Sequence, residues 1–296
     1  MLVTFQLQAI IDRALEEDLG TGDLSAQILP EGLVGQAKLY SKGTAIVAGI
    51  ELVKQVFQRV DTRITVKVLI NDGENVFPGS IVMELSGPLA SILMAERTAL
   101  NFIQHLSGVA TATREAVELV NGLPVRIADT RKTLAGLRAL QKYAVQVGGG
   151  FNHRYGLYDA VLLKDNHLTS LGGLTTAVEL ARQKIGHMVK LEVECESLAQ
   201  VQEALACGVD VIMLDNMTTE QMREAVVFVN HRVIVEASGG IKAGNIRAVA
   251  ETGVDIISLG ALTHSVKSMD FSLDVGDIKL ATRQRIQSDR SEAETQ

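Results

Sequence analysis

The second half of the chain repeats one pattern, a short apolar segment followed by a polar turn and an amphipathic helix, and this repeat restricts the fold more than any other feature. The apolar segments are residues 125–128, 160–164, 190–194, 210–215, 232–237 and 255–260. They lack polar alternation, which is typical of strands covered on both faces. Capping-box spacing at Ser197 and Thr218 places two helix starts just beyond strands. The sequence therefore predicts a parallel β/α array.

The number of repeats limits how this array can close. A complete β/α barrel has eight strands in about 250 residues. Six apolar segments instead predict an incomplete or irregular barrel, and we place a seventh strand near residues 143–149. The alternative is a doubly wound open sheet. No G-x-G-x-x-G follows the first strand, and the GGG at 148–150 is not in that context, so a dinucleotide site is disfavoured.

The chain before residue 88 has a different texture. Short β-like segments alternate with the turn sequences NDGEN at 71–75 and PGS at 78–80. They predict a small antiparallel or mixed sheet packed with the N-terminal helices. A helical segment at 89–120 follows and bridges the two regions. The last residues, 288–296, lack apolar periodicity and are predicted to form a flexible tail.

The charge balance points to a small anionic ligand. The chain has 28 Lys and Arg against 35 Asp and Glu, a net charge of -7. A broad basic face for nucleic acid is therefore not expected. Cations nevertheless gather in the middle of the chain, where only Asp129 and Asp159 oppose them; they are Arg126, Arg131, Lys132, Arg138, Lys142, Arg154 and Lys164. We infer a cationic pocket for a multiply charged anion.

The remaining composition predicts a soluble, cytosolic protein that does not contact membranes. No apolar stretch approaches the roughly 20 residues of a membrane span, and the N-terminus has helical rather than signal-peptide character. Two cysteines, Cys195 and Cys207, are too few for a disulfide framework and are interpreted as ordinary buried thiols.

Polar or glycine residues follow nearly every predicted strand, which is where β/α barrels place their chemistry. Alone, Glu194 or Asp215 could be a surface carboxylate or a helix cap. Both acids facing the same mouth as Lys132 could hold a metal-bound or hydroxyl-rich ligand. Glycine turns at 238–240 and 260–262 offer backbone N–H groups for a phosphate, or serve only as tight turns. The sequence therefore predicts a shared active-site mouth at the strand ends.

The ordered motifs extend this prediction to a family. They are ERTALNFIQHLSGVATAT, ADTRKTLAGLRALQKYAVQVGGGFNHR, LLKDNH, EVE, LDN, ASGGI and GALTHS, and they span residues 96–265. This set resembles the quinolinate phosphoribosyltransferase family. Ala135 stands where the family pattern has proline, a departure that affects a turn rather than a charge. The N-terminal region resembles the family mainly through EEDLGTGDLS at 16–25.

The resemblance implies both an activity and a fold. The family transfers a phosphoribosyl group from phosphoribosyl pyrophosphate to quinolinate with decarboxylation, in the synthesis of NAD, and uses Mg²⁺. The implied fold is an α/β one, an N-terminal α/β sandwich joined to an incomplete seven-stranded β/α barrel, as in type II phosphoribosyltransferases. We place the sandwich at 1–108, with 270–287 packing back on it, and the barrel at 109–269. A homodimer with shared active sites, or a larger assembly of dimers, is also implied.

The resemblance further implies the site residues. The quinolinate carboxylates would meet Arg131, His153, Arg154 and Lys164, with Arg97 supplied by the neighbouring subunit. The catalytic residues would be Lys132, Glu194 and Asp215, of which the two acids would hold Mg²⁺ directly or through water. The phosphates of phosphoribosyl pyrophosphate would lie near Ser238, Gly239, Gly260 and His264.

Two other functions compete with this prediction. A Schiff-base lyase could use Lys164 as its nucleophile at a strand end. A non-catalytic relative could instead bind a phosphorylated metabolite at the same mouth.

Overall fold

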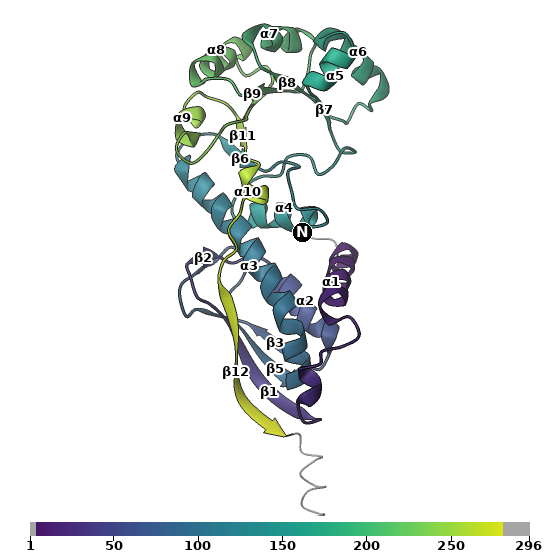
Figure 1. Ribbon diagram of the computed structural model, residues 1–296. Coiled ribbons are helices and arrows are strands. Elements are labelled where there is room, and N and C mark those ends of the chain that lie inside the picture. Colours follow the sequence, from purple (N-terminus) through teal and green to yellow (C-terminus); the bar gives the residue numbers. More distant parts are fainter. Residues whose placement is uncertain (1–3, 281–296) are drawn as a thin grey trace, which may run out of the picture. The chain divides into compact units, whose positions relative to one another are not determined.

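The computed structural model describes residues 4–280, which form two compact units. One unit contains the residues up to Thr111 together with those from Val266 onward, and the other is Ala112–Ser265 (Figure 1). The predicted tail at 288–296 lies outside the described residues. Within residues 4–280, every helix is too short or too polar to cross a membrane.

The first unit is built on a four-stranded antiparallel sheet in the order β12-β1-β5-β3. Its strands are β1 (Leu33–Ser41), β3 (Thr65–Val68), β5 (Ile81–Pro88) and β12 (Phe271–Leu280). Along β1, buried Ala37 and Leu39 alternate with exposed Gln36 and Lys38, as expected when one face of a sheet covers the core. β12 belongs to the 270–287 segment, whose remainder, 281–287, is not described.

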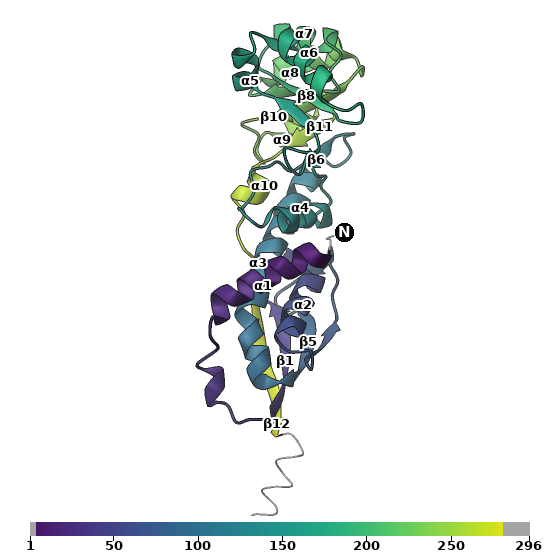
Figure 2. The ribbon, with the colours of Figure 1, turned by 90° about the vertical axis from the view of Figure 1, so that its right-hand side faces the viewer.

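Three helices complete this unit, with a short 3₁₀ helix at Ala26–Ile28 and a small pair of strands, β2 (Ala45–Ile46) and β4 (Asn75–Val76). The helices are α1 (Thr4–Leu19), α2 (Ile50–Val60) and α3 (Leu89–Leu119), of which α3 belongs to this unit as far as Thr111. Figure 2 shows α1 beside α2. α2 begins after Gly49, whose φ is 102° and where an added Cβ would meet Leu106 Cδ1 at 2.8 Å. Only glycine permits both this backbone and this close approach to α3. The predicted helix at 89–120 is confirmed.

The second unit contains the predicted parallel array. Its six strands pair in the order β6-β11-β10-β9-β8-β7, and every ladder is parallel. They are β6 (Arg126–Ala128), β7 (Val161–Leu163), β8 (Leu191–Cys195), β9 (Val211–Asp215), β10 (Ile234–Ser238) and β11 (Ile256–Ser258). All six predicted segments contain these strands or overlap them closely. In β9, for example, the consecutive residues Ile212 and Met213 point to opposite faces of the sheet and both are buried.

Helices separate the strands of the second unit, and α6, α7 and α8 lie on the outer side of the curved sheet (Figure 1). The helices are α4 (Arg138–Val147), α5 (Asp165–Ser170), α6 (Leu174–Lys184), α7 (Leu198–Ala206), α8 (Thr219–Val229), α9 (Ile246–Ala250) and α10 (Ala261–His264). The predicted caps are confirmed. Ser197 accepts a hydrogen bond from the Gln200 amide, and Thr218 accepts one from the Gln221 amide.

The placement of a seventh strand at 143–149 is wrong. These residues fall mainly in α4, where Leu140, Ala144 and Val145 are buried with helical spacing. The chain returns to the sheet only at Phe151, through a single parallel bridge to Ala128. Gly150 permits this return, because an added Cβ would meet Thr113 and Val145 side chains at 2.8 Å. The incomplete barrel itself is confirmed, with Phe151 at the edge next to β6.

Candidate active site

A cavity of about 570 Å³ opens where the strands of the second unit end. Each of the six strands, or the turn after it, contributes to its wall. The lining residues are Thr130, Arg131, Lys132, His153, Arg154, Leu162, Lys164, Glu194, Met213, Asp215, Asn216, Ser238, Gly239, Gly240 and Ser258. The predicted mouth at the strand ends is therefore a real cavity.

One side of the cavity carries an excess of positive charge. Arg154 donates through a guanidinium nitrogen to the carbonyl of Ala160 at 2.9 Å, which orients the guanidinium group. Burial lowers the pKa of Arg154, and the charge of Arg131 lowers it further. The Arg131 Nε is buried and has no hydrogen-bond partner among the described residues. Two neighbouring guanidinium groups with unused donors suit a ligand with more than one carboxylate.

Glu194 and Asp215 form a second charged group on the cavity wall, the acidic side. Lys164 Nζ donates to Glu194 Oε2 at 2.7 Å, and Asn216 Nδ2 donates to Asp215 Oδ2 at 2.7 Å. Burial raises the pKa of Asp215, and the adjacent Glu194 carboxylate raises it further through charge repulsion. Two carboxylates held this close favour a cation or a hydroxyl-rich ligand between them.

Two glycines let the backbone approach these side chains. Gly239 has a φ of 81°, and an added Cβ would meet Asp215 Oδ1 at 2.8 Å. At Gly260 it would meet Lys132 Cδ at 2.9 Å and His264 Nε2 at 3.1 Å. Any larger residue would push into the groups that line the cavity or contact it.

His153 lies at the inner end of the cavity against two buried acids. Its Nε2 is 3.1 Å from Glu192 Oε2 and 3.5 Å from Glu236 Oε1. Burial lowers the pKa of His153, but the two carboxylates together raise it above its ordinary value. Burial and the charge of Glu192 raise the pKa of Glu236 to about 7.

These three ligand atoms lie within 4.8 Å of one another, a spacing that a metal ion could also use. However, His153 Nδ1 accepts a hydrogen bond from the Arg154 amide at 2.7 Å, which assigns the ring proton to Nε2. A metal at Nε2 would require that proton to move to Nδ1, facing the amide N–H. The group is therefore a hydrogen-bonded histidine and carboxylate cluster.

Known proteins match both units. Residues 23–107 match the N-terminal domain and residues 109–274 the C-terminal domain of quinolinate phosphoribosyl transferase. The chain belongs to the quinolinate phosphoribosyltransferase family.

Individual members of this phosphoribosyltransferase family are similar to the chain over nearly its whole length. The probable nicotinate-nucleotide pyrophosphorylase (carboxylating) of Bacillus subtilis strain 168 is 45% identical over 270 residues, covering 91% of this chain and 93% of the relative. Among solved structures, the nicotinate-nucleotide pyrophosphorylase from Francisella tularensis is 40% identical, with a TM-score of 0.90 and coverage of 93% and 98%. NadC from Streptococcus pyogenes is 39% identical, also with a TM-score of 0.90, covering 95% and 99%.

The structure brings most of the predicted phosphoribosyltransferase residues together. Nine line the cavity: Arg131, Lys132, His153, Arg154, Lys164, Glu194, Asp215, Ser238 and Gly239. Gly260 lies beside both Lys132 and His264, and neither Gly260 nor His264 lines the cavity. Arg97 lies on α3 in the first unit, and its assignment to a neighbouring subunit's site stays a prediction.

The sequence-based prediction of the cationic pocket was wrong at three positions, because Arg126, Arg138 and Lys142 do not line the cavity. Lys142 counted among the pocket cations, but its side chain is fully buried and pairs with Asp129. The helical pattern does not mark this burial, because Leu140 and Lys142 lie on opposite faces of α4 and both are buried. Both cysteines are free; Cys195 is buried, as expected, whereas Cys207 is half-buried.

Proposed function

We propose that the cavity of the second unit transfers a phosphoribosyl group from phosphoribosyl pyrophosphate to quinolinate, with release of pyrophosphate and CO₂. The product is nicotinate mononucleotide, a precursor in NAD synthesis. The observation that carries the proposal is the division of one cavity into a cationic side and an acidic side, in a chain that matches this family over both units.

On the cationic side, Arg131, Arg154 and Lys164 pair with the two carboxylates of quinolinate. Adjacent carboxylates repel each other and are costly to desolvate unless each is paired, and the planar fork of arginine can pair with both oxygens of one. His153 also lines the cavity next to these cations. Both of its ring nitrogens already have protein partners, so it contacts quinolinate through the face of its ring and not through a hydrogen bond.

On the acidic side, Glu194 and Asp215 hold the ribose. Breaking the bond between C1 and pyrophosphate produces positive charge on the ribose, which the two carboxylates stabilise. Lys132 neutralises charge on the departing pyrophosphate. The backbone turns at Ser238, Gly239 and Gly260, with His264, hold phosphate oxygens.

The two acids also fit the Mg²⁺ that the family resemblance implies. Oxygen ligands suit Mg²⁺. Burial and, after it, the neighbouring Glu194 carboxylate raise the pKa of Asp215, and a divalent cation would relieve the repulsion between the two acids. When bound, Mg²⁺ neutralises the leaving pyrophosphate. Glu194 and Asp215 would hold it directly or through water.

The decarboxylation needs a pocket that holds the carboxylate loosely enough to lose it. Transfer gives the pyridine ring a positive charge, which stabilises the electron pair left on the ring carbon when CO₂ departs, and a proton from solvent then binds to that carbon. Arg154 is half-buried, so this part of the cavity is sheltered from water. In such a site the carboxylate that leaves as CO₂ can give up its ion pair with arginine more easily.

The assembly and location are also proposals. A homodimer in which Arg97 completes the neighbour's cavity agrees with the family resemblance, and a cytoplasmic location stays the prediction from the sequence. The rival lyase is less well supported, because a nucleophilic lysine must present a free amine, whereas Lys164 Nζ is held by Glu194.

The deciding experiment measures nicotinate mononucleotide by chromatography after incubation with quinolinate, phosphoribosyl pyrophosphate and Mg²⁺. We expect stoichiometric release of pyrophosphate and CO₂. Reactions without either substrate are the controls. A substrate with an aldehyde or ketone group that borohydride traps covalently on Lys164 would instead support the lyase.

A further inference from the structure

A fully buried ion pair lies beneath the cationic side of the cavity. Asp129 follows β6 and Lys142 is in the middle of α4, and the side chains of both have no exposed surface. Lys142 Nζ donates to Asp129 Oδ1, and its ammonium also lies 5.1 Å from the centre of the Tyr155 ring. A buried pair of charges is costly to desolvate and is weak evidence for stability by itself, so its geometry invites a functional explanation.

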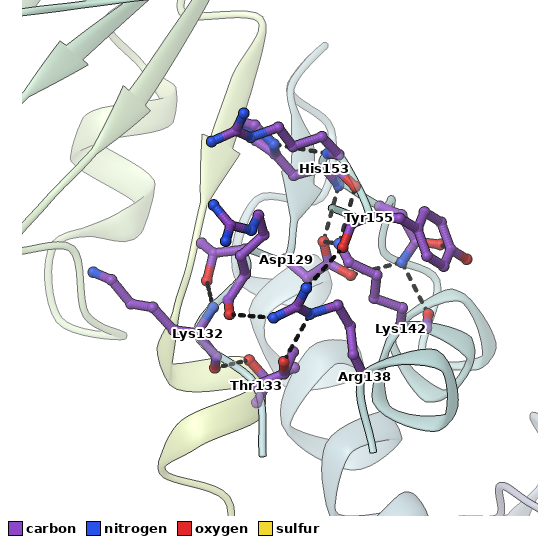
Figure 3. Close-up of polar contacts among 12 residues, drawn as sticks. Asp129, Lys132, Thr133, Arg138, Lys142, His153 and Tyr155 are labelled. Carbon is purple, nitrogen blue, oxygen red and sulfur yellow. Dashed lines mark hydrogen bonds and ion pairs between the residues drawn. The ribbon is translucent and has the colours of Figure 1, made fainter. Parts of the chain in front are cut away.

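The pair holds the backbone of His153 on both sides (Figure 3). Asp129 Oδ1 accepts a hydrogen bond from the His153 amide at 2.9 Å, and Lys142 Nζ donates to the His153 carbonyl, also at 2.9 Å. Asn152 Nδ2 donates to Asp129 Oδ2 at 2.6 Å and to the Lys142 carbonyl at 2.9 Å. The peptide groups on either side of the His153 Cα therefore cannot shift without breaking a bond to a buried charge.

The same contacts join the two segments that carry the cations of the cavity. One segment contains Asp129 and, two positions later, Arg131. The other contains His153 and, directly after it, Arg154. α4 adds a second connection, since Arg138 donates to the Tyr155 carbonyl at 3.1 Å and to Thr133 Oγ1 at 3.0 Å. The spacing between Arg131 and Arg154 is thus set by α4 and the buried pair.

Lys132 is held by contacts that do not include the buried pair, although they begin at Gln141 of the same helix as Lys142. Its carbonyl accepts a hydrogen bond from Thr263 Oγ1 at 2.7 Å, and the Thr263 carbonyl accepts one from Gln141 Nε2, also at 2.7 Å. Glu194 and Asp215 lie at the ends of β8 and β9, away from the buried pair in the order of the sheet. Loss of the buried pair should therefore disturb the contacts with quinolinate more than those with phosphoribosyl pyrophosphate.

We propose that Lys142, through Asp129 and the backbone of His153, is a positioning residue that sets the spacing of the quinolinate-binding cations without touching either substrate. This inference rests on the proposed function for the identity of the ligand. It assigns the buried pair to affinity for the dicarboxylate, whereas phosphoribosyl pyrophosphate binding depends on the separately held groups.

The test compares dissociation constants for quinolinate and phosphoribosyl pyrophosphate, measured separately by calorimetry on the full chain, with steady-state KM and kcat. For Lys142→Met we expect the Kd and KM for quinolinate to rise about tenfold or more, with those for phosphoribosyl pyrophosphate changed by less than about threefold. Lys142→Arg, which keeps the charge and its donors, should recover part of the quinolinate affinity.

Met222→Ala is the matched control, because Met222 is buried in α8 of the same unit and lines none of the cavity. It should lower the melting temperature while both Kd values stay unchanged. Equal weakening of both substrates in Lys142→Met, or unchanged quinolinate affinity, would overturn the proposal.

If Lys142→Met does not fold, Asn152→Ala decides, since it removes one donor to Asp129 and leaves the ion pair intact. A selective rise in quinolinate Kd of about threefold supports positioning, and no selective rise refutes it. Wild-type protein that binds quinolinate but makes no nicotinate mononucleotide would contradict the proposed function, not the positioning role.

Discussion

Lys164 and Glu194 are joined by an ion pair across two neighbouring strand ends, with Nζ 2.7 Å from Oε2. Lys164 follows β7 and Glu194 is in β8, and the two strands pair in parallel. The lysine side chain is 47% exposed and the glutamate 13%. The pair therefore links a cation proposed for quinolinate with an acid proposed for the ribose.

Glu194→Gln should separate these two roles. Removal of the carboxylate charge frees Lys164 for quinolinate, so the Kd for quinolinate alone should stay equal or fall. Turnover should drop by about a hundredfold or more, because one of the two acids that stabilise the ribose cation is lost. Calorimetry and initial rates measure the two effects. Glu224→Gln, at an exposed position of α8, is the control, and weaker quinolinate binding in Glu194→Gln would count against the assignment.

Alanine substitutions of Lys132 and Arg154 should change different kinetic and binding constants. Lys132→Ala should reduce kcat more than quinolinate affinity, because Lys132 is assigned to the departing pyrophosphate. Arg154→Ala should mainly raise the Kd for quinolinate. Steady-state kinetics and calorimetry on both variants check this. The reverse pattern would show that the two roles are exchanged.

The barrel strands were predictable from the sequence because their signal is local. Strand β9 is apolar on both faces up to Asp215, whereas β8 and β10 alternate apolar residues with Glu192, Glu194 and Glu236. Ser197 and Thr218 mark the helix starts that follow β8 and β9. The site followed from the strands, since parallel strands bring their carboxyl ends to one edge.

The seventh strand and the buried lysine could not be predicted in the same way. Phe151 makes a single bridge to the sheet, which leaves no periodic pattern to detect. Lys142 pairs with Asp129, thirteen positions earlier in the chain, so its burial depends on tertiary contacts. A charged residue in a helix is usually exposed to solvent. Lys142 is buried instead because it pairs with Asp129, which directly follows the edge strand β6.

The cationic side should make the enzyme selective for a dicarboxylate. Nicotinate has one carboxylate, so its binding would leave part of the buried charge of Arg131 and Arg154 unpaired. We expect kcat/KM for quinolinate to exceed that for nicotinate by about a thousandfold or more. Competition assays with both acids and phosphoribosyl pyrophosphate measure the ratio. Equal values would contradict the proposed division of the cavity.

Glu236 should make the stability depend on pH. Its pKa of about 7 lies above the ordinary 4.5, because burial and Glu192 disfavour its charge. Folding therefore favours the protonated form, whose contribution to stability is complete below about pH 4.5 and is lost as the pH rises through 7. The side chain of Glu236→Gln is neutral at every pH. As the pH rises through this range, the unfolding free energy of the variant should therefore increase relative to that of the wild type by up to about 3 kcal/mol.

Urea unfolding at a series of pH values measures this difference. The exposed Glu179→Gln should show no such trend. A constant difference between Glu236→Gln and the wild type from pH 4.5 to 8 would mean that Glu236 stays ionised in the folded protein.

Arg97 provides the test of a shared site. It lies on α3, and the family resemblance assigns it to the cavity of the neighbouring subunit. Arg97→Ala and Lys132→Ala should then each be nearly inactive, but subunit exchange should restore activity. In a mixed dimer one site receives both substitutions and the other neither. Half of the dimers are mixed after random exchange of equal amounts, so about a quarter of all sites should be wild type in a closed two-fold dimer. Confirmed exchange by native mass spectrometry without recovered activity would assign Arg97 to its own subunit.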